Sequence, residues 1–336
     1  MISDDAFWDV PIQLKETIGR LINVPADEVI LGNSTSYGLY LLAQGLPWKP
    51  EDEVLLVEGD FPASVVPWLP LEKRGVQIRF LRPATAVPTP EEVERAITPS
   101  TRVFCSSWVF SFRGHAIDID PIGEVCRAHR VLFVLNGSQA IGTRPIDARA
   151  AKIGALVCCG FKWLCGPYAT GFSFMRPEVL DSLTFEPAYW LTQISKDELG
   201  KESNYRLRPV RDAASYDVFG TANFFNFMPL AASIGTLLGV GIDEIARYND
   251  ALVDRLVSGL DDERFDLVSP VSGQQRSTLV LIQPRDRSKS RVVHETLAAN
   301  GVDVALRGDK IRFSPHVYNT EDDIDRALAV LDQAGR

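Results

Sequence analysis

Short apolar, β-rich runs recur through the first half of the chain, with helical patterns between them, and several of these runs are apolar throughout. The clearest runs are EVLLV (53–57), VLFVL (131–135) and ALVCC (155–159). Strands that are apolar at every position are typical of a parallel sheet covered on both faces. Candidate helices, such as residues 36–46 and 89–97, lie between such runs. This alternation of strands and helices predicts a doubly wound α/β layer.

The predicted layer contains seven strands in a mostly parallel sheet. They span residues 28–31, 53–57, 77–81, 101–107, 131–135, 155–159 and 170–175. A polar segment with weak periodicity, residues 190–216, follows them and is predicted to be a long loop over the surface or the site.

The pattern changes after about residue 235. A candidate helix leads to shorter candidate strands, and a final helix begins near Thr320 with acidic residues in its first turn. The candidate strands span residues 277–283, 302–306 and 310–314. We therefore predict a large α/β domain over residues 1–235 and a smaller α+β domain over residues 236–336.

Composition narrows the possible partners and location. The chain has 336 residues, 46% hydrophobic content and a formal net charge of −9. This charge disfavours a nucleic-acid backbone or an anionic membrane as a partner. No apolar run approaches the roughly 20 residues that cross a bilayer, and the acidic N-terminus is unlike a signal peptide. We predict a cytoplasmic protein.

The five cysteines are Cys105, Cys126, Cys158, Cys159 and Cys165. Their number is odd and their spacing matches no zinc pattern, so we expect buried, reduced thiols and no metal site.

The first candidate site residue is Asn136, in VLNGSQAIG (134–142). It stands where a buried strand ends in a tight turn, and such strand ends are where α/β proteins usually carry their chemistry. A neutral amide at this position raises the question of which charge it replaces.

The second candidate is Lys162, which follows the buried strand 155–159 and precedes a Gly-Pro turn. A lysine there is not on an obvious solvated helix face. Its amine can form a Schiff base with a carbonyl cofactor if its surroundings depress its pKa. The alternative is an ordinary surface lysine.

Asn136 and Lys162, 26 positions apart, belong to a pattern that resembles the class V aminotransferase family, the cysteine-desulfurase-like branch of pyridoxal-phosphate (PLP) enzymes. Other segments that resemble this family occur in the right order. They are GNSTSYGLYLLAQGL (32–46), GDFPASVVPW (59–68), FGTANFFN (219–226) and IRFSPHVYNTEDDID (311–325). The first two look most like isopenicillin-N-epimerase-like relatives.

This resemblance implies the PLP-dependent transferase fold type I, a homodimer and an active site shared between subunits. Lys162 would carry PLP and Asn136 would face its ring nitrogen; these two are the predicted catalytic residues. The other predicted cofactor-binding residues are Thr35, Ser36, Phe61, Ser111, Gln139 and Thr221, the last reaching the partner's cofactor. Arg312 would bind the carboxylate of an amino-acid substrate, because a guanidinium pairs with a carboxylate in a two-pronged geometry.

The chain departs from the family pattern around the cofactor. The family's Asp is Asn136, and the Ser and His before the lysine are Cys159 and Phe161. An amide cannot favour a protonated ring nitrogen by Coulomb attraction, so the ring should be a weaker electron sink. Three explanations of the asparagine at position 136 are open. It is natural and serves a reaction that needs a weaker electron sink, or it is an engineered change, or the protein has lost PLP and keeps the fold for another role. Family members also usually have a longer segment before the first helix, predicted at 9–22, so a more open or differently closed pocket is expected.

The reaction prediction rests on the cysteines. Family desulfurases use a cysteine in the C-terminal third, and none follows Cys165. This absence disfavours persulfide-based desulfuration unless one of the earlier cysteines is recruited. The resemblance then implies a PLP enzyme acting on an amino acid or its derivative by lyase, epimerase or aminotransferase chemistry. The alternative is a protein on the same scaffold that has lost PLP and serves a cofactor-independent or non-enzymatic interaction role.

Overall fold

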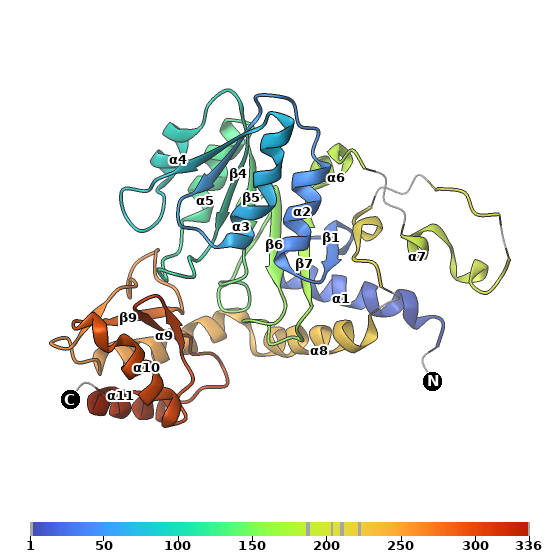
Figure 1. The fold of residues 1–336 in the computed structure, drawn as a ribbon. Helices are drawn as coiled ribbons and strands as arrows, with labels where there is room; N and C mark the ends of the chain where they lie inside the picture. The colour runs from blue at the N-terminus through green and yellow to red at the C-terminus, as the bar shows by residue number, and fades with distance from the viewer. Residues whose placement is uncertain (1–2, 186–188, 203, 209–211, 221–222, 335–336) are drawn as a thin grey trace.

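The chain forms a large sheet flanked by helices, and a second, smaller sheet toward the C-terminus (Figure 1). The computed structural model describes residues 3–185, 189–202, 204–208, 212–220 and 223–334.

The large sheet contains the seven predicted strands, each within one residue of its expected bounds. They are β1 (Val29–Gly32), β2 (Glu53–Val57), β3 (Gln77–Leu81), β4 (Thr101–Ser107), β5 (Leu132–Asn136), β6 (Ala155–Cys159) and β7 (Gly171–Met175). Their order is β1-β7-β6-β5-β4-β2-β3. Strands β3, β2, β4, β5 and β6 are parallel, and β7 runs antiparallel to both β6 and β1. The predicted mostly parallel α/β fold is confirmed.

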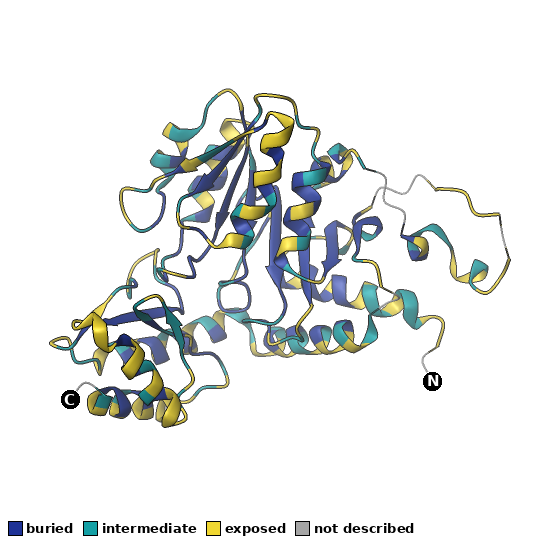
Figure 2. Ribbon diagram, in the orientation of Figure 1, coloured by how far each residue is buried: buried dark blue, intermediate teal, exposed yellow. Residues whose placement is uncertain are grey.

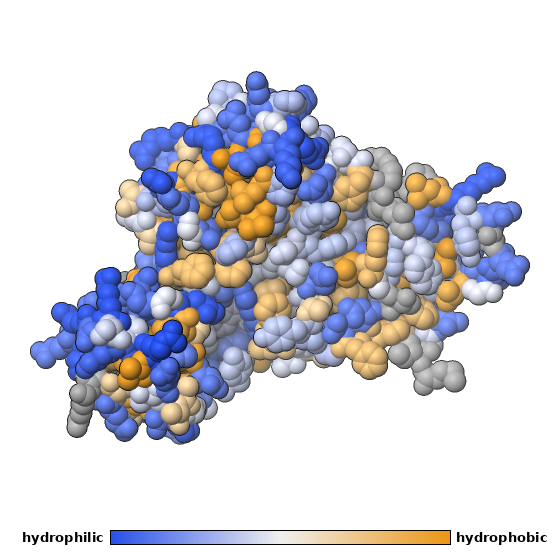
Figure 3. Space-filling view, in the orientation of Figure 1, coloured by the Kyte–Doolittle hydropathy of each residue, from blue (hydrophilic) through white to orange (hydrophobic). Residues whose placement is uncertain are grey.

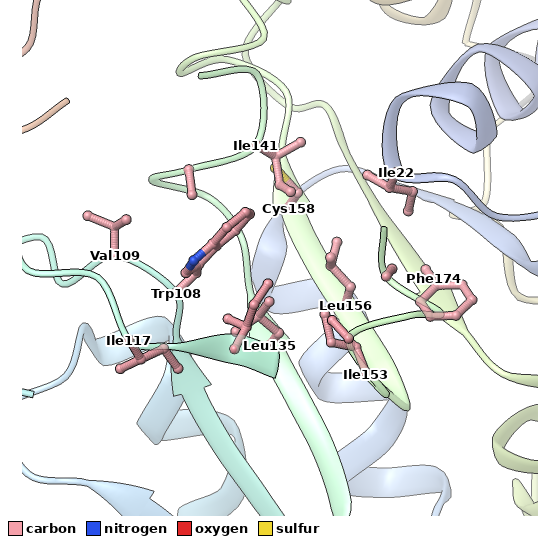
Figure 4. Packing of buried hydrophobic residues seen from close by; sticks show 14 of the residues in the cluster. Ile22, Trp108, Val109, Ile117, Leu135, Ile141, Ile153, Leu156, Cys158 and Phe174 are labelled. Carbon is pink, nitrogen blue, oxygen red and sulfur yellow. The ribbon is translucent and has the colours of Figure 1, made fainter. Parts of the chain in front are cut away.

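Both faces of this sheet are buried along its central strands, which explains why these strands are apolar at successive positions, whereas the edge strand β3 is partly exposed (Figure 2). Leu135 and Leu156 belong to the core on one face, where they lie near Trp108 (Figure 4). Their neighbours Val134 and Val157 belong to the core on the other face. Because successive side chains of a strand point to opposite faces, a two-sided core requires apolar residues at both.

Helices surround the sheet and connect it to the C-terminal part. They are α1 (Ala6–Ile22), α2 (Thr35–Gly45), α3 (Pro62–Val65), α4 (Pro90–Ala96), α5 (Ile119–Ala128), α6 (Pro177–Ser182), α7 (Trp190–Gln193), α8 (Phe224–Val240), α9 (Ile242–Ser258), α10 (Ser290–Ala299) and α11 (Glu321–Ala334). Short 3-10 helices span Ala26–Glu28, Val66–Arg74, Lys196–Glu198, Ala213–Tyr216 and Arg287–Lys289. The described parts of 190–216 contain α7 and two of these turns, in an otherwise irregular segment.

The second sheet has four antiparallel strands in the order β10-β11-β9-β8. They are β8 (Phe265–Leu267), β9 (Val280–Pro284), β10 (Ala305–Arg307) and β11 (Lys310–Phe313). Their apolar side chains form a separate core with α9, α10 and α11, and hydrophilic side chains cover much of the outside of this region (Figure 3). Strand β8 was not predicted. The domain division at residue 235 stays a prediction, and α8 runs across that position.

Among the described residues, no single helix is long and apolar enough to cross a membrane. Only when α8 and α9 are taken together do they have the length and apolar composition of a membrane span, and the two helices are bent by 79° relative to each other.

Candidate active site

The candidate site lies where the parallel strands of the large sheet end. Strand β5 ends at Asn136 and β4 ends at Ser107, while Lys162 follows β6 after Gly160 and Phe161. Because the carboxyl ends of parallel strands meet at one edge, these residues from distant parts of the sequence come together.

One narrow cavity unites most of the predicted cofactor-binding residues. It is lined by Thr35, Phe61, Ala63, Ser107, Val109, Ser111, Asn136, Ser138, Gln139 and Lys162. Its free volume is about 20 Å³, which is room for roughly one water molecule.

Lys162 faces an aromatic ring across this cavity. Its Nζ lies 5.4 Å from the centroid of the Phe61 ring. Phe61 in turn stacks on Phe112, with ring centroids 6.0 Å apart and planes inclined by 28°. The predicted stacking residue and the predicted lysine are thus neighbours.

Two hydroxyls meet at the N-terminus of α2. Thr35 Oγ1 and Ser138 Oγ are 2.6 Å apart and both residues are buried. A helix N-terminus has free N–H groups and a positive dipole end, so hydroxyls placed there suit a phosphate. Ser138 was missed by the sequence analysis, although it lies between Asn136 and Gln139 in the quoted motif. Ser36 is exposed and does not line the cavity. Thr221 lies outside the described residues.

Asn136 is buried and held on both sides of its amide. Its Nδ2 donates to Ser64 Oγ at 2.9 Å, and its Oδ1 accepts from the Ser138 backbone N–H at 3.1 Å. Ser64 was also missed, because a lone serine in a helix carries no sequence signal.

Gln139 connects the cavity to the C-terminal sheet. Its Oε1 accepts from the Trp163 indole at 3.1 Å, and its Nε2 donates to Ser111 Oγ at 3.4 Å. Ser111 Oγ also accepts from an Arg312 Nη1 at 2.7 Å. Arg312 therefore reaches the site from β11 through Ser111.

The Arg312 guanidinium has a free donor inside the protein. Its Nε is buried and has no hydrogen-bond partner among the described residues. Burial lowers the pKa of Arg312 to about 10, with a smaller contribution from the nearby Arg307 cation. The group remains charged at neutral pH, and a buried donor without a partner is costly unless an anion binds it.

His316 adds a second connection between the two sheets. Its Nε2 lies 2.8 Å from the Trp163 carbonyl oxygen, and its ring packs edge-on against the Trp163 ring. Burial lowers the pKa of His316, so the neutral imidazole donates this hydrogen bond at neutral pH. The sequence analysis did not single out this residue.

No group of three or more potential metal ligands from His, Cys, Asp or Glu comes together in the described part of the chain. Four of the five cysteines are buried as expected, whereas Cys165 is exposed.

The chain belongs to the class V aminotransferase family, whose sequence profile matches residues 9–327. A protein named probable cysteine desulfurase from Methanothermobacter thermautotrophicus is 26% identical over 96% of this chain and 82% of that protein. A protein of the same name from Pyrococcus abyssi is 25% identical over 95% and 82%, respectively. A Bacillus subtilis protein named uncharacterized aminotransferase YcbU is 24% identical over 94% and 81%.

Solved structures share the fold. The apo cysteine desulfurase from Thermococcus onnurineus NA1 superimposes with a TM-score of 0.85 at 20% identity, covering 98% of this chain and 85% of that one. The cystine C-S lyase C-DES, solved in complex with its reaction product cysteine persulfide, gives a TM-score of 0.85 at 19% identity, covering 99% and 88%. Family membership confirms the prediction of a PLP-dependent enzyme.

The predicted reaction class was wrong where it excluded persulfide-based desulfuration. Relatives named cysteine desulfurases, which match nearly the whole chain, contradict it. The sulfur acceptor was expected to be a cysteine in the C-terminal third. Cys165 is an exposed thiol that follows Lys162 by three residues in the sequence. A missing cysteine in one segment therefore does not exclude the chemistry.

Proposed function

We propose that this protein is a PLP-dependent enzyme that cleaves the carbon–sulfur bond of L-cysteine or a closely related amino acid. The observation that carries the proposal is the single cavity in which Lys162, Asn136 and Gln139 meet, with Arg312 one hydrogen-bonded residue away. The names of the relatives support cysteine as the substrate class.

The donors around the cavity fit the chemical groups of PLP. The Lys162 amine would hold the aldehyde, Thr35 and Ser138 at the α2 N-terminus would hold the phosphate, and Phe61 would cover the ring. Asn136 would contact the ring nitrogen and Gln139 the phenolic oxygen. When bound, PLP supplies an electron sink for charge that develops at the substrate Cα.

The residues of the chain then have separate tasks. Arg312 binds the substrate carboxylate through its buried, unpartnered Nε and its remaining donors. Lys162 Nζ moves the proton at the substrate Cα, as general base and then as general acid. Phe61 and Phe112 keep water from one side of the cavity.

Cys165 is our candidate for the sulfur acceptor. It is the exposed thiol among the five cysteines. With this acceptor the reaction balances as L-cysteine plus enzyme thiol giving L-alanine plus enzyme persulfide, because the sulfur moves as a neutral atom between two thiols. No external oxidant or reductant is needed.

The proposal includes a cytoplasmic homodimer with a shared site and a small-molecule amino-acid substrate. Large apolar side chains support the dimer because they are exposed next to the segment expected to reach the partner. Phe219, Phe225 and Met228 are 71%, 92% and 54% exposed. The net charge of −9 supports the absence of nucleic-acid or membrane partners. The division at residue 235 and the partner-facing role of Thr221 belong to the same proposal.

The proposal is tested with purified protein incubated with PLP and then with L-cysteine. We expect a visible absorption band, borohydride trapping at Lys162 detected by mass spectrometry, and release of L-alanine. Lys162→Ala should lose the band and the trapping, whereas Lys73→Ala, which changes an exposed lysine that does not line the cavity, should keep both.

Sulfur transfer is followed separately by mass spectrometry of the Cys165 peptide and by Cys165→Ser. A persulfide on Cys165 and loss of alanine formation in the variant support it as the acceptor. PLP-loaded protein that leaves cysteine and cystine intact would contradict the proposed function.

A further inference from the structure

Position 136 carries no negative charge, but a buried carboxylate, that of Asp60, lies nearby. Asp60 lies just after β2, is 8% exposed, and belongs to the segment that also carries Phe61 and Ser64. The sequence analysis did not single it out.

Asp60 is the end point of several hydrogen bonds. Its Oδ1 accepts from the Phe61 N–H at 2.6 Å and from the Ser107 hydroxyl at 2.6 Å, and its Oδ2 accepts from the Ser107 N–H at 2.8 Å. Burial raises the pKa of Asp60, while these donors and the Arg113 cation oppose that rise. A carboxylate that accepts at both oxygens fits its ionised form.

The hydrogen bonds continue from Ser107 to Asn136. Ser107 Oγ lies 3.3 Å from Ser64 Oγ, and Ser64 Oγ accepts from Asn136 Nδ2 at 2.9 Å. All four residues are buried. A continuous path of side-chain hydrogen bonds therefore joins the Asp60 carboxylate to the amide at the end of β5.

The ionised Asp60 carboxylate can only accept hydrogen bonds, so it determines which group donates in each hydrogen bond along this path. A hydroxyl has one hydrogen, and the Ser107 hydroxyl uses its hydrogen on Asp60. Ser64 must then donate to Ser107, which leaves Ser64 Oγ able only to accept from Asn136. The amide nitrogen, not the amide oxygen, is required on that side.

The other side of the amide agrees with this orientation. Asn136 Oδ1 accepts from the Ser138 N–H, so a flipped amide would lose both contacts. The second Nδ2 hydrogen has no acceptor among the described residues, and Asn136 lines the cavity. The group available to a ligand in the cavity is therefore an N–H donor.

We propose that Asp60 is a positioning residue that acts through Ser107 and Ser64 to present the Asn136 N–H to the ring nitrogen of PLP and so hold that nitrogen unprotonated. The inference rests on the proposed cofactor site. An N–H donor pairs with the lone pair of a neutral pyridine nitrogen and opposes its protonation. An aspartate at position 136 would do the reverse.

The direct test is the nitrogen NMR signal of PLP that carries ¹⁵N in its ring, bound to the protein. We expect the unprotonated position in the parent and the protonated position in Asn136→Asp. Asp60→Asn and Ser64→Ala should move the signal part of the way, because the amide is then free to turn. They should also weaken PLP binding by about five- to tenfold, the value of one hydrogen bond.

The matched control is Ser106→Ala. Ser106 is a fully buried serine one position before Ser107, and among the described residues its hydroxyl bonds only to the Ser107 carbonyl oxygen. This change should leave the ring-nitrogen signal in place. If Asp60→Asn fails to fold, Ser64→Ala carries the test by itself, since it removes one hydroxyl and leaves Asp60 and Ser107 paired.

A second readout needs no cofactor. In the PLP-free protein, the side-chain NH₂ of Asn136 should exchange slowly with solvent, and Ser64→Ala should accelerate this exchange whereas Ser106→Ala should not. A protonated ring nitrogen in the parent, or identical signals in parent and Ser64→Ala, would overturn the inference and leave the proposed function standing. Parent protein that takes up no PLP would refute the proposed function, and the amide exchange would still decide whether Ser64 holds Asn136.

Discussion

At the scale of single residues, the site contains a buried hydrogen-bond donor, the Nε of Arg312, that has no partner among the described residues. Arg312 has one hydrogen bond to Ser111 Oγ at 2.7 Å and a longer one to its carbonyl oxygen at 3.3 Å, while its Nε has none among the described residues. Natural structures satisfy most buried donors. The Nε of Arg312 is an exception, and the carboxylate of the proposed substrate would supply its missing partner.

Arg312→Gln should therefore weaken amino-acid binding without releasing PLP. We expect a loss of about 2 kcal/mol or more, or about 30-fold in the dissociation constant, as for one partner of a buried charge pair. Arg312→Lys should recover only part of it, because an ammonium lacks the two-pronged geometry. The change in the cofactor absorption on titration with L-cysteine measures the binding.

Arg307→Gln is the control for this change, because Arg307 lies near Arg312 but is not hydrogen-bonded to Ser111. Its effect should be several times smaller. Equal losses in the two variants would mean that general positive charge, and not the Arg312 geometry, binds the substrate.

The sequence predicted part of this site and missed the rest for a physical reason. Asn136, Gln139 and Lys162 follow buried strands, and a motif read along the chain marks them. Asp60 and Ser107 are adjacent only because β2 and β4 are neighbours in the sheet. Contacts of this kind depend on strand order and register, which a single sequence does not contain.

At the scale of elements, α2 must approach the sheet closely to bring Thr35 to the cavity. A Cβ at Gly38 would lie 1.9 Å from Ser173 Oγ on β7 and 2.7 Å from a Val157 methyl on β6. Only a residue without a side chain allows this distance. The N-terminus of α2 is therefore positioned by a glycine one turn into the helix.

Gly38→Ala should push α2 away from the sheet. We expect a loss of about 1–3 kcal/mol in the free energy of unfolding, the usual range for an overpacked core, together with weaker PLP binding as Thr35 moves. Chemical denaturation and equilibrium dialysis with PLP measure the two effects.

Gly235→Ala in α8 is the matched control. Apart from its own helix, no described residue has an atom within 4 Å of the position that a Cβ at Gly235 would occupy, so the change should stabilise the helix by up to about 1 kcal/mol and leave PLP binding unchanged. A Gly38→Ala protein with parental stability would show that α2 is not held against the sheet.

The elements themselves were mostly predictable. Most strands of the large sheet are largely apolar, and all seven were found from their sequence runs. Strand β8 has three residues, of which Asp266 and Leu267 are exposed, so it lacks both the length and the pattern that mark a strand. Its pairing with β9 defines it, and this pairing is a tertiary contact.

At the scale of the whole molecule, a buried ion pair joins the N-terminal helix to the segment that precedes α8. Lys15 Nζ lies 2.9 Å from Asp217 Oδ1, with side-chain exposures of 7% and 10%. The Leu31 N–H of β1 also donates to Asp217 at 2.7 Å. Helix α1 and strand β1, which are close in sequence, therefore meet a distant segment of the chain at the Asp217 carboxylate.

The pH dependence of stability follows from the burial of this carboxylate. Burial raises the pKa of Asp217 to about 6, although the Lys15 cation opposes the rise; the ordinary value in the unfolded chain is about 4. Between these values the folded protein keeps a proton that the unfolded chain has released. This group therefore makes the protein less stable as pH rises from about 4 to about 6.

Lys15→Met should enlarge this pH dependence. Without the lysine, the pKa of Asp217 rises further, so the carboxyl stays neutral at pH 5 but is driven toward an unpaired buried charge at pH 8. We expect a loss of about 3 kcal/mol or more in the free energy of unfolding at pH 8 and less than half of that at pH 5. Lys196→Met, which removes an exposed lysine paired with Asp5 and Asp9, should change little at either pH. If urea denaturation gave the same loss for Lys15→Met at both pH values, Asp217 would not be the group that the lysine neutralises, and the loss would come from packing alone.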